Sequence, residues 1–331
     1  MVQRRGIATA GNWIVDRVKI IDHWPDQDTL ALVLDEDRGT GGGAYNSLVD
    51  LRRMGVDYPL RAIGCVGDDA DGAWIRADLE ALAIDHQHLT VCPEAPTSYT
   101  EVMSVADTGR RTFFHNYGAN ALFGPEHFPL DSLDCRVLHL AYLLLLKRLD
   151  SLGPDGRSVG ATVLEAASQA GFVTSLDLVS ELSDRVQPIV LPALPHVDSL
   201  VINELEAQAL TGIEIQGRDD LRSAADALLT AGVRRQVIIH QPEGGYGRLA
   251  DGEECYQPSL NLPSGFIKGA VGAGDAFAAG VLHGLHEGWD LPSTLRLAVA
   301  TATACLRHAT CTLGVQAMAD NLALLDQYPE R

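Results

Sequence analysis

The stretch Gly272-Ala273-Gly274-Asp275 places a single carboxylate directly after three small residues. Glycine loses more backbone freedom on folding than other residues, so a glycine-rich turn indicates that the backbone must approach something closely. Apolar residues at helical spacing follow, which predicts that the turn opens a helix. Free N–H groups at a helix N-terminus bind anions, and the glycines would let a phosphate reach them. Asp275 would then act as a base on a hydroxyl beside that phosphate.

Asp275 has a simpler interpretation as a helix cap, which is worth about 1 kcal/mol. A cap needs no Gly-Ala-Gly before it, so we favour the base. The chain has no G-x-x-x-x-G-K-[ST] stretch, which excludes a Walker-type phosphate loop. Gly39, Gly41 and Ala44 loosely fit a dinucleotide fingerprint, but they do not lie in the first strand–helix unit of an alternating domain. We therefore reject a nicotinamide site.

The composition limits the partners that this chain can bind. Its 331 residues are 46% hydrophobic, which is enough to bury a large core. Asp and Glu number 44 against 25 Lys and Arg, and the net charge of −19 repels nucleic acids and anionic membranes. A small anionic ligand would need a site built from backbone N–H groups or from local positive charge.

The cysteines and the apolar runs indicate a compartment. The six cysteines form no CxxC pair and no zinc spacing, which predicts free thiols in a reducing environment. No apolar segment typical of a secretion signal follows the first arginines. The longest apolar run, residues 138–146, is too short to span a bilayer. We therefore expect a cytoplasmic protein with no membrane partner.

Strands and helices alternate from about residue 130 onward, which predicts an α/β domain with a parallel sheet covered on both faces. The predicted strands are 136–143, 172–178, 198–204 and 235–241. The predicted helices are 160–171, 205–212 and 219–232.

The first 120 residues instead suggest a small β-element mounted on that core. Polar-interrupted strands are predicted at 12–22, 29–37, 97–107 and 110–116. Core-like stretches at 41–55 and 58–83 lie between them, so this sheet would be discontinuous in sequence. It would serve as a lid or as a contact in a homodimer.

Alternation along the last of these strands divides its side chains between two faces. Arg111, Phe113 and His115 face one way, and the intervening residues face the other. The pattern does not say which face meets a ligand.

Five elements, taken together and in order, resemble the ribokinase-like (PfkB-type) carbohydrate kinases. They are Asp16 in GNWIVD, GGGAYN at 41–46, GCVGDDADG at 64–72 with Asp69 and Gly72, NELE at 203–206, and KGAVGAGDAFAAG at 268–280. The resemblance implies a three-layer fold over residues 1–331 as a single domain. Its mostly parallel sheet would lie between helices, and a small β-sheet lid would come from 12–37 and 97–116.

Members of this family transfer the γ-phosphoryl group of ATP to a hydroxyl of a sugar or a nucleoside. The resemblance implies that Asp275 is the catalytic base, and that the N–H groups of Gly272, Ala273 and Gly274 form an anion hole. Such a hole would stabilise charge on the transferring group without adding a titrating side chain.

The other elements acquire roles in the same way. Asp16 and Asn46 would hold hydroxyls of the sugar, against which Gly42 and Gly43 would pack. The alternatives are a surface acid at the end of a strand for Asp16 and a helix cap for Asn46.

The resemblance also implies residues for the nucleotide and its metal. Asn203 and Glu206 would orient Mg²⁺, with Glu206 acting through water, because Mg²⁺ keeps much of its hydration. A capping box at an ordinary helix start explains this pair equally well. Gly245 would belong to the nucleotide loop, although Pro242 replaces the first glycine that the family has there.

One departure concerns a monovalent cation. Many relatives bind such an ion through an Asp and Thr before the anion hole, where this chain has Gly269, Ala270 and Val271. None of these has a side-chain oxygen, so a potassium ion is disfavoured. Lys268, which directly precedes these three residues, would supply positive charge instead, unless it is a solvated surface lysine.

The leading interpretation is an ATP-dependent sugar kinase that uses Mg²⁺. A nucleoside kinase of the same fold is the alternative among enzymes, and a catalytically silent sugar or nucleotide sensor is the alternative outside them. The residues that would choose the acceptor are unassigned, so the sequence does not identify it.

Overall fold

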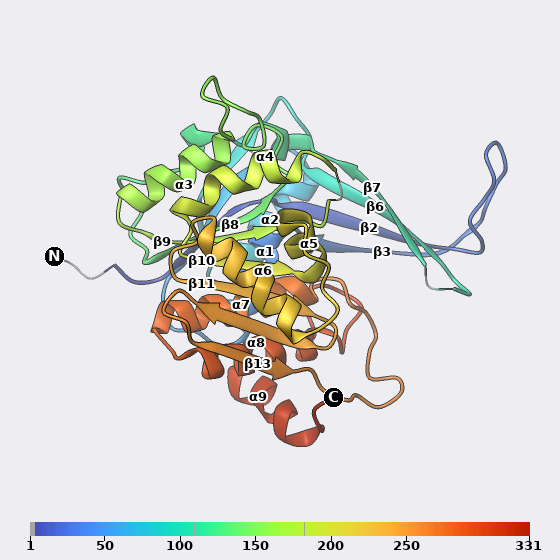
Figure 1. The fold of residues 1–331 in the computed structure, drawn as a ribbon. Coiled ribbons are helices and arrows are strands. Elements are labelled where there is room, and N and C mark those ends of the chain that lie inside the picture. Colours follow the sequence, from blue (N-terminus) through green and yellow to red (C-terminus); the bar gives the residue numbers. More distant parts are fainter. Residues whose placement is uncertain (1–3, 109, 182) are drawn as a thin grey trace.

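Two sheets form the framework of the computed structural model, which describes residues 4–108, 110–181 and 183–331 (Figure 1). The larger sheet has nine strands in the order β13-β12-β11-β10-β9-β8-β1-β4-β5, and only the pairs β11–β12 and β12–β13 are antiparallel. Its strands are β1 (Ile7–Gly11), β4 (Leu60–Gly67), β5 (Asp85–Cys92), β8 (Val137–Leu143), β9 (Val173–Leu178), β10 (Ser199–Asn203), β11 (Gln236–Gln241), β12 (Gly244–Leu249) and β13 (Glu254–Pro258).

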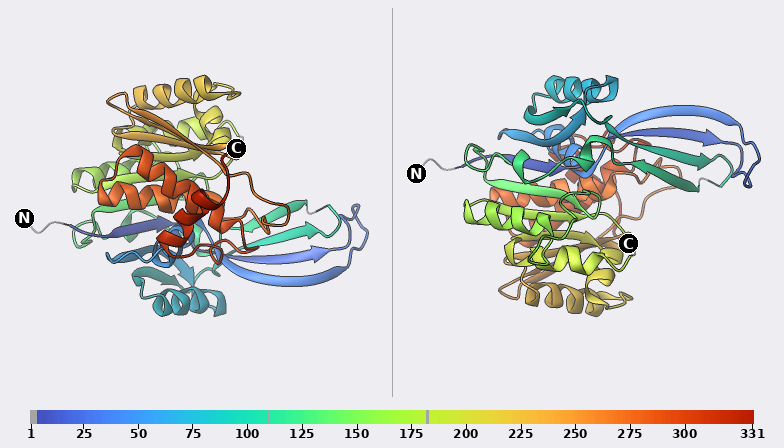
Figure 2. Two further views of the ribbon diagram at one scale, coloured as in Figure 1. Left: turned by 90° about the horizontal axis from the view of Figure 1, so that it is seen from below. Right: turned by 90° about the horizontal axis from the view of Figure 1, so that it is seen from above.

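Helices cover both faces of this sheet, which confirms the predicted three-layer α/β fold (Figure 2). Successive strand residues alternate between the two cores: Leu200 and Ile202 pack on one side of the sheet, and Val201 packs on the other. One side carries α3 (Val159–Gln169), α4 (Val186–Val190), α5 (Glu204–Thr211) and α6 (Arg218–Thr230). The other carries α1 (Gly43–Arg53), α2 (Ala70–Ala81), α7 (Ala273–Glu287), α8 (Leu291–Cys305) and α9 (Met318–Gln327).

Short 3₁₀ turns complete the layers. They are η1 (Gly118–Ala121), η2 (Pro125–His127) and η3 (Leu191–His196). Within the described ranges, none of the helices has the length and apolar character needed to cross a bilayer.

The smaller sheet projects from one side of this body and is called the lid below (Figures 1 and 2). Its strand order is β3-β2-β6-β7, and β2 and β6 pair in parallel at its centre. The strands are β2 (Ile14–Ile21), β3 (Val33–Gly41), β6 (Ser98–Val105) and β7 (Arg111–Asn116). β3 therefore starts later than the predicted strand and runs past its predicted end, directly into the turn before α1.

The chain crosses from the large sheet to the lid at Asn12 and Trp13, between β1 and β2. The prediction of one strand over 12–22 missed this crossing, because β1 is a short run of small residues. The indole of Trp13 is fully buried and donates to the carbonyl oxygen of Ile63 at 2.9 Å. The Asn12 side chain accepts from the N–H of Tyr142 at 2.9 Å, so the base of the lid is fixed on the body.

Candidate active site

Asp275 lies in the first turn of α7, as the sequence predicts, and it is buried. Gly272 precedes the helix with a φ of 82°, and a Cβ atom there would lie 2.6 Å from the carbonyl oxygen of Cys311. A glycine is therefore required at this position. The first residues of α7, Ala273 and Gly274, line one of the two cavities described below.

The carboxylate of Asp275 is held by two side chains from distant elements rather than by its own helix. Asn46 donates from Nδ2 to Oδ2 at 2.6 Å, and the hydroxyl of Tyr142 donates to Oδ1 at 2.9 Å. Burial raises the pKa of Asp275, and these two hydrogen bonds oppose the rise. The simple helix-cap interpretation does not fit, because within the described chain this carboxylate accepts from Asn46 and Tyr142 and α7 has no side-chain cap hydrogen bond.

The glycines at the start of α1 allow the close approach that brings Asn46 to Asp275. A Cβ atom on Gly42, which has a φ of 90°, would lie 2.3 Å from the carbonyl oxygen of Asn12. A Cβ on Gly43 would lie 2.5 Å from the ring of Tyr142. A side chain at either position would therefore collide with neighbouring protein atoms. The Oδ1 atom of Asn46 is buried and has no partner within the described chain, so it is free to accept a hydrogen bond.

Asp16 lies on β2, at the end of the lid that joins the body. Burial raises its pKa to about 6, and the negative charge of Asp275 adds to the rise. Gly41 has no predicted contact of its own, but a Cβ atom there would lie 2.6 Å from Oδ2 of Asp16. Gly41 therefore leaves room for the carboxylate beside the glycine-rich turn.

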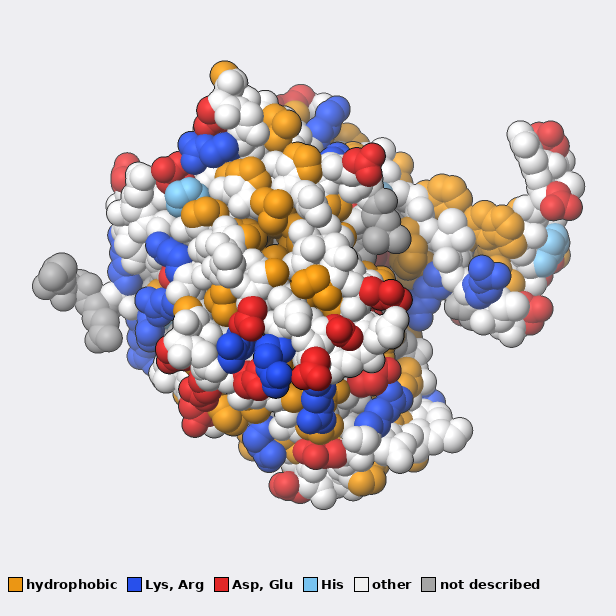
Figure 3. Space-filling view, viewed as in Figure 1, with side chains coloured by type: hydrophobic (Ala, Val, Ile, Leu, Met, Phe, Trp, Pro, Cys, Tyr) orange, Lys and Arg blue, Asp and Glu red, His pale blue; other side chains and the backbone are white. Residues whose placement is uncertain are grey.

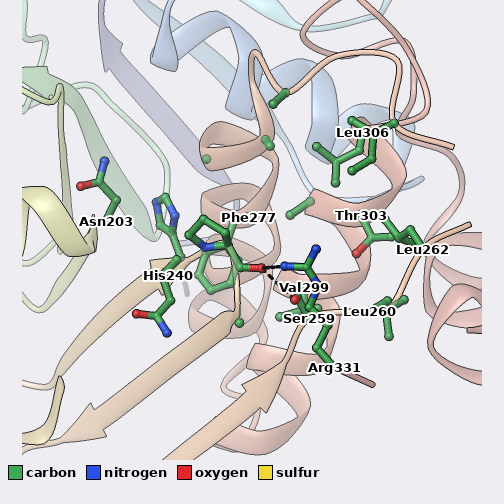
Figure 4. A pocket seen from close by; sticks show the side chains of 18 of the residues that line it. Asn203, His240, Ser259, Leu260, Leu262, Phe277, Val299, Thr303, Leu306 and Arg331 are labelled. Atoms are coloured by element: carbon green, nitrogen blue, oxygen red, sulfur yellow. Dashed lines mark hydrogen bonds between the residues drawn. The ribbon is translucent and has the colours of Figure 1, made fainter. Parts of the chain in front are cut away.

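Two cavities flank the turn before α7. The first has a volume of about 430 Å³ and reaches Ala273 and Gly274 at the helix start (Figure 4). His240 lines it beside Gly274, and burial lowers the pKa of this histidine to about 4, so the ring is neutral at pH 7. The apolar side chains that line this cavity include Leu260, Leu262, Phe277, Val299 and Leu306.

The second cavity lies under the lid and has a volume of about 320 Å³. Asp16, Lys268, Val271 and Cys311 line it from the body side and the base of the lid. Two consecutive residues just before the turn line different cavities: Ala270 lines the first and Val271 lines the second. Asp275 directly follows Gly274, which lines the first cavity, and lies four residues after Val271, which lines the second.

Asn203 and Glu206 form a reciprocal capping box at the start of α5. The Asn203 side chain accepts from the N–H of Glu206, and Oε2 of Glu206 accepts from the N–H of Asn203, both at 2.9 Å. Oε1 of Glu206 accepts from Ser180 at 2.9 Å, and burial raises the pKa of this carboxyl to about 7. The pair therefore forms the capping box that the sequence offered as the alternative to a role toward Mg²⁺. Asn203 also lines the first cavity.

The predicted nucleotide loop after β11 lies beside the same cavity. Gly244 and Pro242 line it, whereas Gly245 packs against the ring of Phe277. The carbonyl oxygen of Pro242 accepts from Ser259 at 2.8 Å and from Arg331 at 3.2 Å (Figure 4). The proline that departs from the family pattern thus holds the loop and the C-terminal residue together.

Three residues near Asp275 were not predicted from the sequence. Tyr142 lies within a run that predicts only a buried strand, and its polar hydroxyl was the available signal. Asp50 and Asp177 are buried, and burial together with the charge of Asp275 raises the pKa of both well above the usual range. In the portion of the chain that the structure covers, no group of three or more His, Cys, Asp or Glu residues could hold a metal ion directly.

Comparisons with known proteins agree with this architecture. The family model for pfkB family carbohydrate kinases matches residues 10–318, so the chain belongs to this family. An ATP-dependent ribose-1-phosphate kinase from Halopiger xanaduensis is 29% identical over 305 residues, which cover 90% of each chain. A nucleoside kinase from Methanocaldococcus jannaschii is 22% identical over 311 residues, which cover 92% of this chain and 91% of the relative.

Among solved structures, the ribokinase of Arabidopsis thaliana complexed with ribose and ATP matches with a TM-score of 0.80. Its sequence identity is 21%, and the match covers 98% of this chain and 99% of that one. The protein is therefore a carbohydrate kinase of this family with a ribokinase-like fold.

Proposed function

We propose that the enzyme transfers the γ-phosphoryl group of ATP to a hydroxyl of a sugar, with Asp275 as the general base. The observation that carries this proposal is the position of the Asp275 carboxylate. It is buried at the N-terminus of α7, in a segment whose other residues line the two cavities, and it is oriented by Asn46 and Tyr142.

ATP occupies the first cavity, with its base between the apolar walls and its phosphates at the start of α7. The N–H groups of Gly272, Ala273 and Gly274 then face the transferring group and stabilise charge on its oxygens. The bond between the γ-phosphorus and the bridging oxygen of ADP breaks, a bond to the acceptor oxygen forms, and Asp275 takes the hydroxyl proton. His240 is neutral, so positive charge must come from elsewhere.

Mg²⁺ fits the chemistry of the nearby oxygen donors. Both carboxylate oxygens of Glu206 accept hydrogen bonds from the protein, so Glu206 and Asn203 would hold the ion through its water ligands. When bound with ATP, the ion neutralises negative charge on the phosphates.

The acceptor lies in the second cavity. Asp16 accepts hydrogen bonds from hydroxyls, and the free Oδ1 of Asn46 offers a further acceptor. Gly42 and Gly43 contribute by letting α1 approach, which places Asn46 near the reacting hydroxyl. The lid, built from two separated segments, covers this cavity.

The proposal is tested with ATP labelled at the γ-phosphate and a panel of sugars and nucleosides. We expect label on an organic acceptor only when ATP, Mg²⁺ and that acceptor are all present. Binding of ATP and sugar without transfer to any acceptor would contradict the proposal and would instead indicate a sensor.

A further inference from the structure

Strand register determines which lid side chains face the acceptor cavity. In the row nearest the body, Asp16 pairs with Gly39 and Thr100, and Thr100 pairs with His115. Directly paired residues share one face of a sheet, so these side chains lie on the face that lines the cavity. This first row is polar. Arg111 and Phe113 line the cavity too, which resolves the face of β7 that the alternation left open.

The second row of the same face is mainly apolar. Val18 pairs with Val102, which pairs with Phe113, and all three line the cavity. The body contributes an apolar wall to the same cavity through Val271, Ala309 and Cys311. The second row and this wall bound an apolar slot that begins about 7 Å, or two residues, beyond Asp16 along β2.

Phe113 is the aromatic side chain of this slot. Its side chain is 58% exposed, and none of the aromatic rings in the described segments packs against it. The next residue, Phe114, is 51% exposed on the opposite face and stacks on Trp24 with ring centres 6.2 Å apart. Two adjacent phenylalanines of similar exposure therefore differ in one respect: the ring facing the cavity is available to a ligand.

Polar groups border the slot at the two edges of the lid. Asp37 pairs with Val18, and Asp35 pairs with Ile20, so two carboxylates lie along β3. Arg111 lies at the opposite edge, on β7. Carboxylates accept hydrogen bonds and guanidinium donates them, so a flat ring in the slot would find both kinds of partner at its periphery.

We propose that the acceptor is a nucleoside, with its sugar at Asp16 and its base in the slot against Phe113. This inference rests on the proposed phosphotransfer and names its acceptor class. A polar row followed by an apolar slot matches a molecule that has hydroxyls at one end and a flat ring at the other. A free sugar has hydroxyls on all sides and would leave the apolar walls without a partner.

The test compares kcat/KM for adenosine, inosine, uridine and cytidine with that for D-ribose and ribose 1-phosphate. We expect at least one nucleoside to exceed both sugars by about tenfold or more, because stacking on an aromatic side chain contributes strongly to base binding. Phe113→Ala should then raise the KM for that nucleoside by about tenfold and change kcat/KM for ribose by less than twofold. Phe114→Ala, the matched control on the other face, should change neither.

Transfer to ribose or ribose 1-phosphate in preference to every nucleoside would overturn the nucleoside assignment and leave the proposed function intact. An equal loss for ribose and the nucleoside in Phe113→Ala would also overturn it, since the ring would then not read the base. Failure to phosphorylate any acceptor would overturn both proposals.

Discussion

The turn that opens α7 and the cavity face of the lid differ in how far the protein itself supplies partners for their side chains. Asp275 is buried, and each of its oxygens already accepts a hydrogen bond from a protein side chain. On the lid, Phe113 is exposed, and hydrophobic side chains gather on the projecting sheet (Figure 3). Under the proposed function, this difference means that the reacting groups are set before substrate binds, whereas the acceptor supplies the missing partner of the lid.

From this contrast we expect substitutions in the turn to lower mainly kcat, and substitutions in the lid to raise mainly the KM for the acceptor. The proposed base and N–H donors would act in the transition state, while the exposed lid side chains would act through binding. The following predictions test that division.

Asp275→Asn keeps the shape of the side chain and removes the base. We expect kcat to fall by about 10²- to 10⁴-fold, the usual contribution of general-base catalysis, with acceptor binding nearly unchanged. Steady-state kinetics and calorimetric acceptor binding measure the two effects. Asp290→Asn is the matched control, because Asp290 is an exposed carboxylate that caps α8 by accepting from the N–H of Ser293 at 2.8 Å. Near-normal turnover in Asp275→Asn would remove Asp275 from the chemistry.

Asp16→Ala should act on acceptor binding. Hydrogen bonds to a charged group contribute about 1.5–3 kcal/mol, so we expect the acceptor KM to rise by about 10- to 150-fold. The KM for ATP should change by less than twofold, because Asp16 lines the cavity under the lid and not the first cavity. Equal increases in both KM values would place Asp16 outside the acceptor site.

The pH dependence should reveal the same residue. Burial raises the pKa of Asp16 to about 6, and only its carboxylate form offers both oxygens purely as acceptors for two hydroxyls. As the pH falls below about 6, Asp16 becomes protonated, so the acceptor KM should rise by about tenfold per pH unit. Asp16→Asn should have a higher KM that no longer varies with pH in this range. An unchanged pH profile of KM in that variant would contradict the assignment.

The lid should become ordered when acceptor binds. Amide hydrogen exchange in the predicted lid segments, 12–37 and 97–116, should slow severalfold at saturating acceptor, because closure excludes water from the cavity. Mass spectrometry of the free and saturated enzyme measures this change. Unchanged exchange would favour the other interpretation of this sheet, a static contact between the subunits of a homodimer.

Potassium should have the smallest effect. Gly269, Ala270 and Val271 offer no side-chain oxygen, and the nearby Lys268 lines the acceptor cavity. We expect less than a twofold change in rate when potassium replaces a bulky organic cation at constant ionic strength and constant Mg²⁺. Severalfold activation would show that main-chain oxygens build a cation site in this loop.

The sequence predicts the glycine-rich turn, Asp275 and the layered fold because each leaves a local pattern. Gly272 directly precedes α7, and Asp275 lies three residues later, in the first turn of that helix. The sequence did not predict Tyr142, whose hydroxyl reaches Asp275 across 133 residues of chain. No local spacing encodes such a contact, because it depends on how β8 and α7 pack.

Strand register limits the prediction of the lid in the same way. Alternation separates Phe113 from Phe114, but only the pairing of four strands shows that Phe113 shares a face with Asp16. Asn203 and Glu206 show the opposite problem, since a capping box and a metal-orienting pair have the same spacing. The structure shows the capping box, and the role toward Mg²⁺ remains a proposal.

The most direct test is the single-turnover rate of phosphotransfer at saturating ATP and acceptor, measured side by side in Asp275→Asn and Phe113→Ala. Saturation removes differences in binding, so this rate reports the chemical step alone. We expect Phe113→Ala to transfer within twofold of the wild-type rate and Asp275→Asn to be slower by at least about 100-fold. Wild-type transfer in Asp275→Asn would contradict the central claim that the buried carboxylate at the start of α7 is the base.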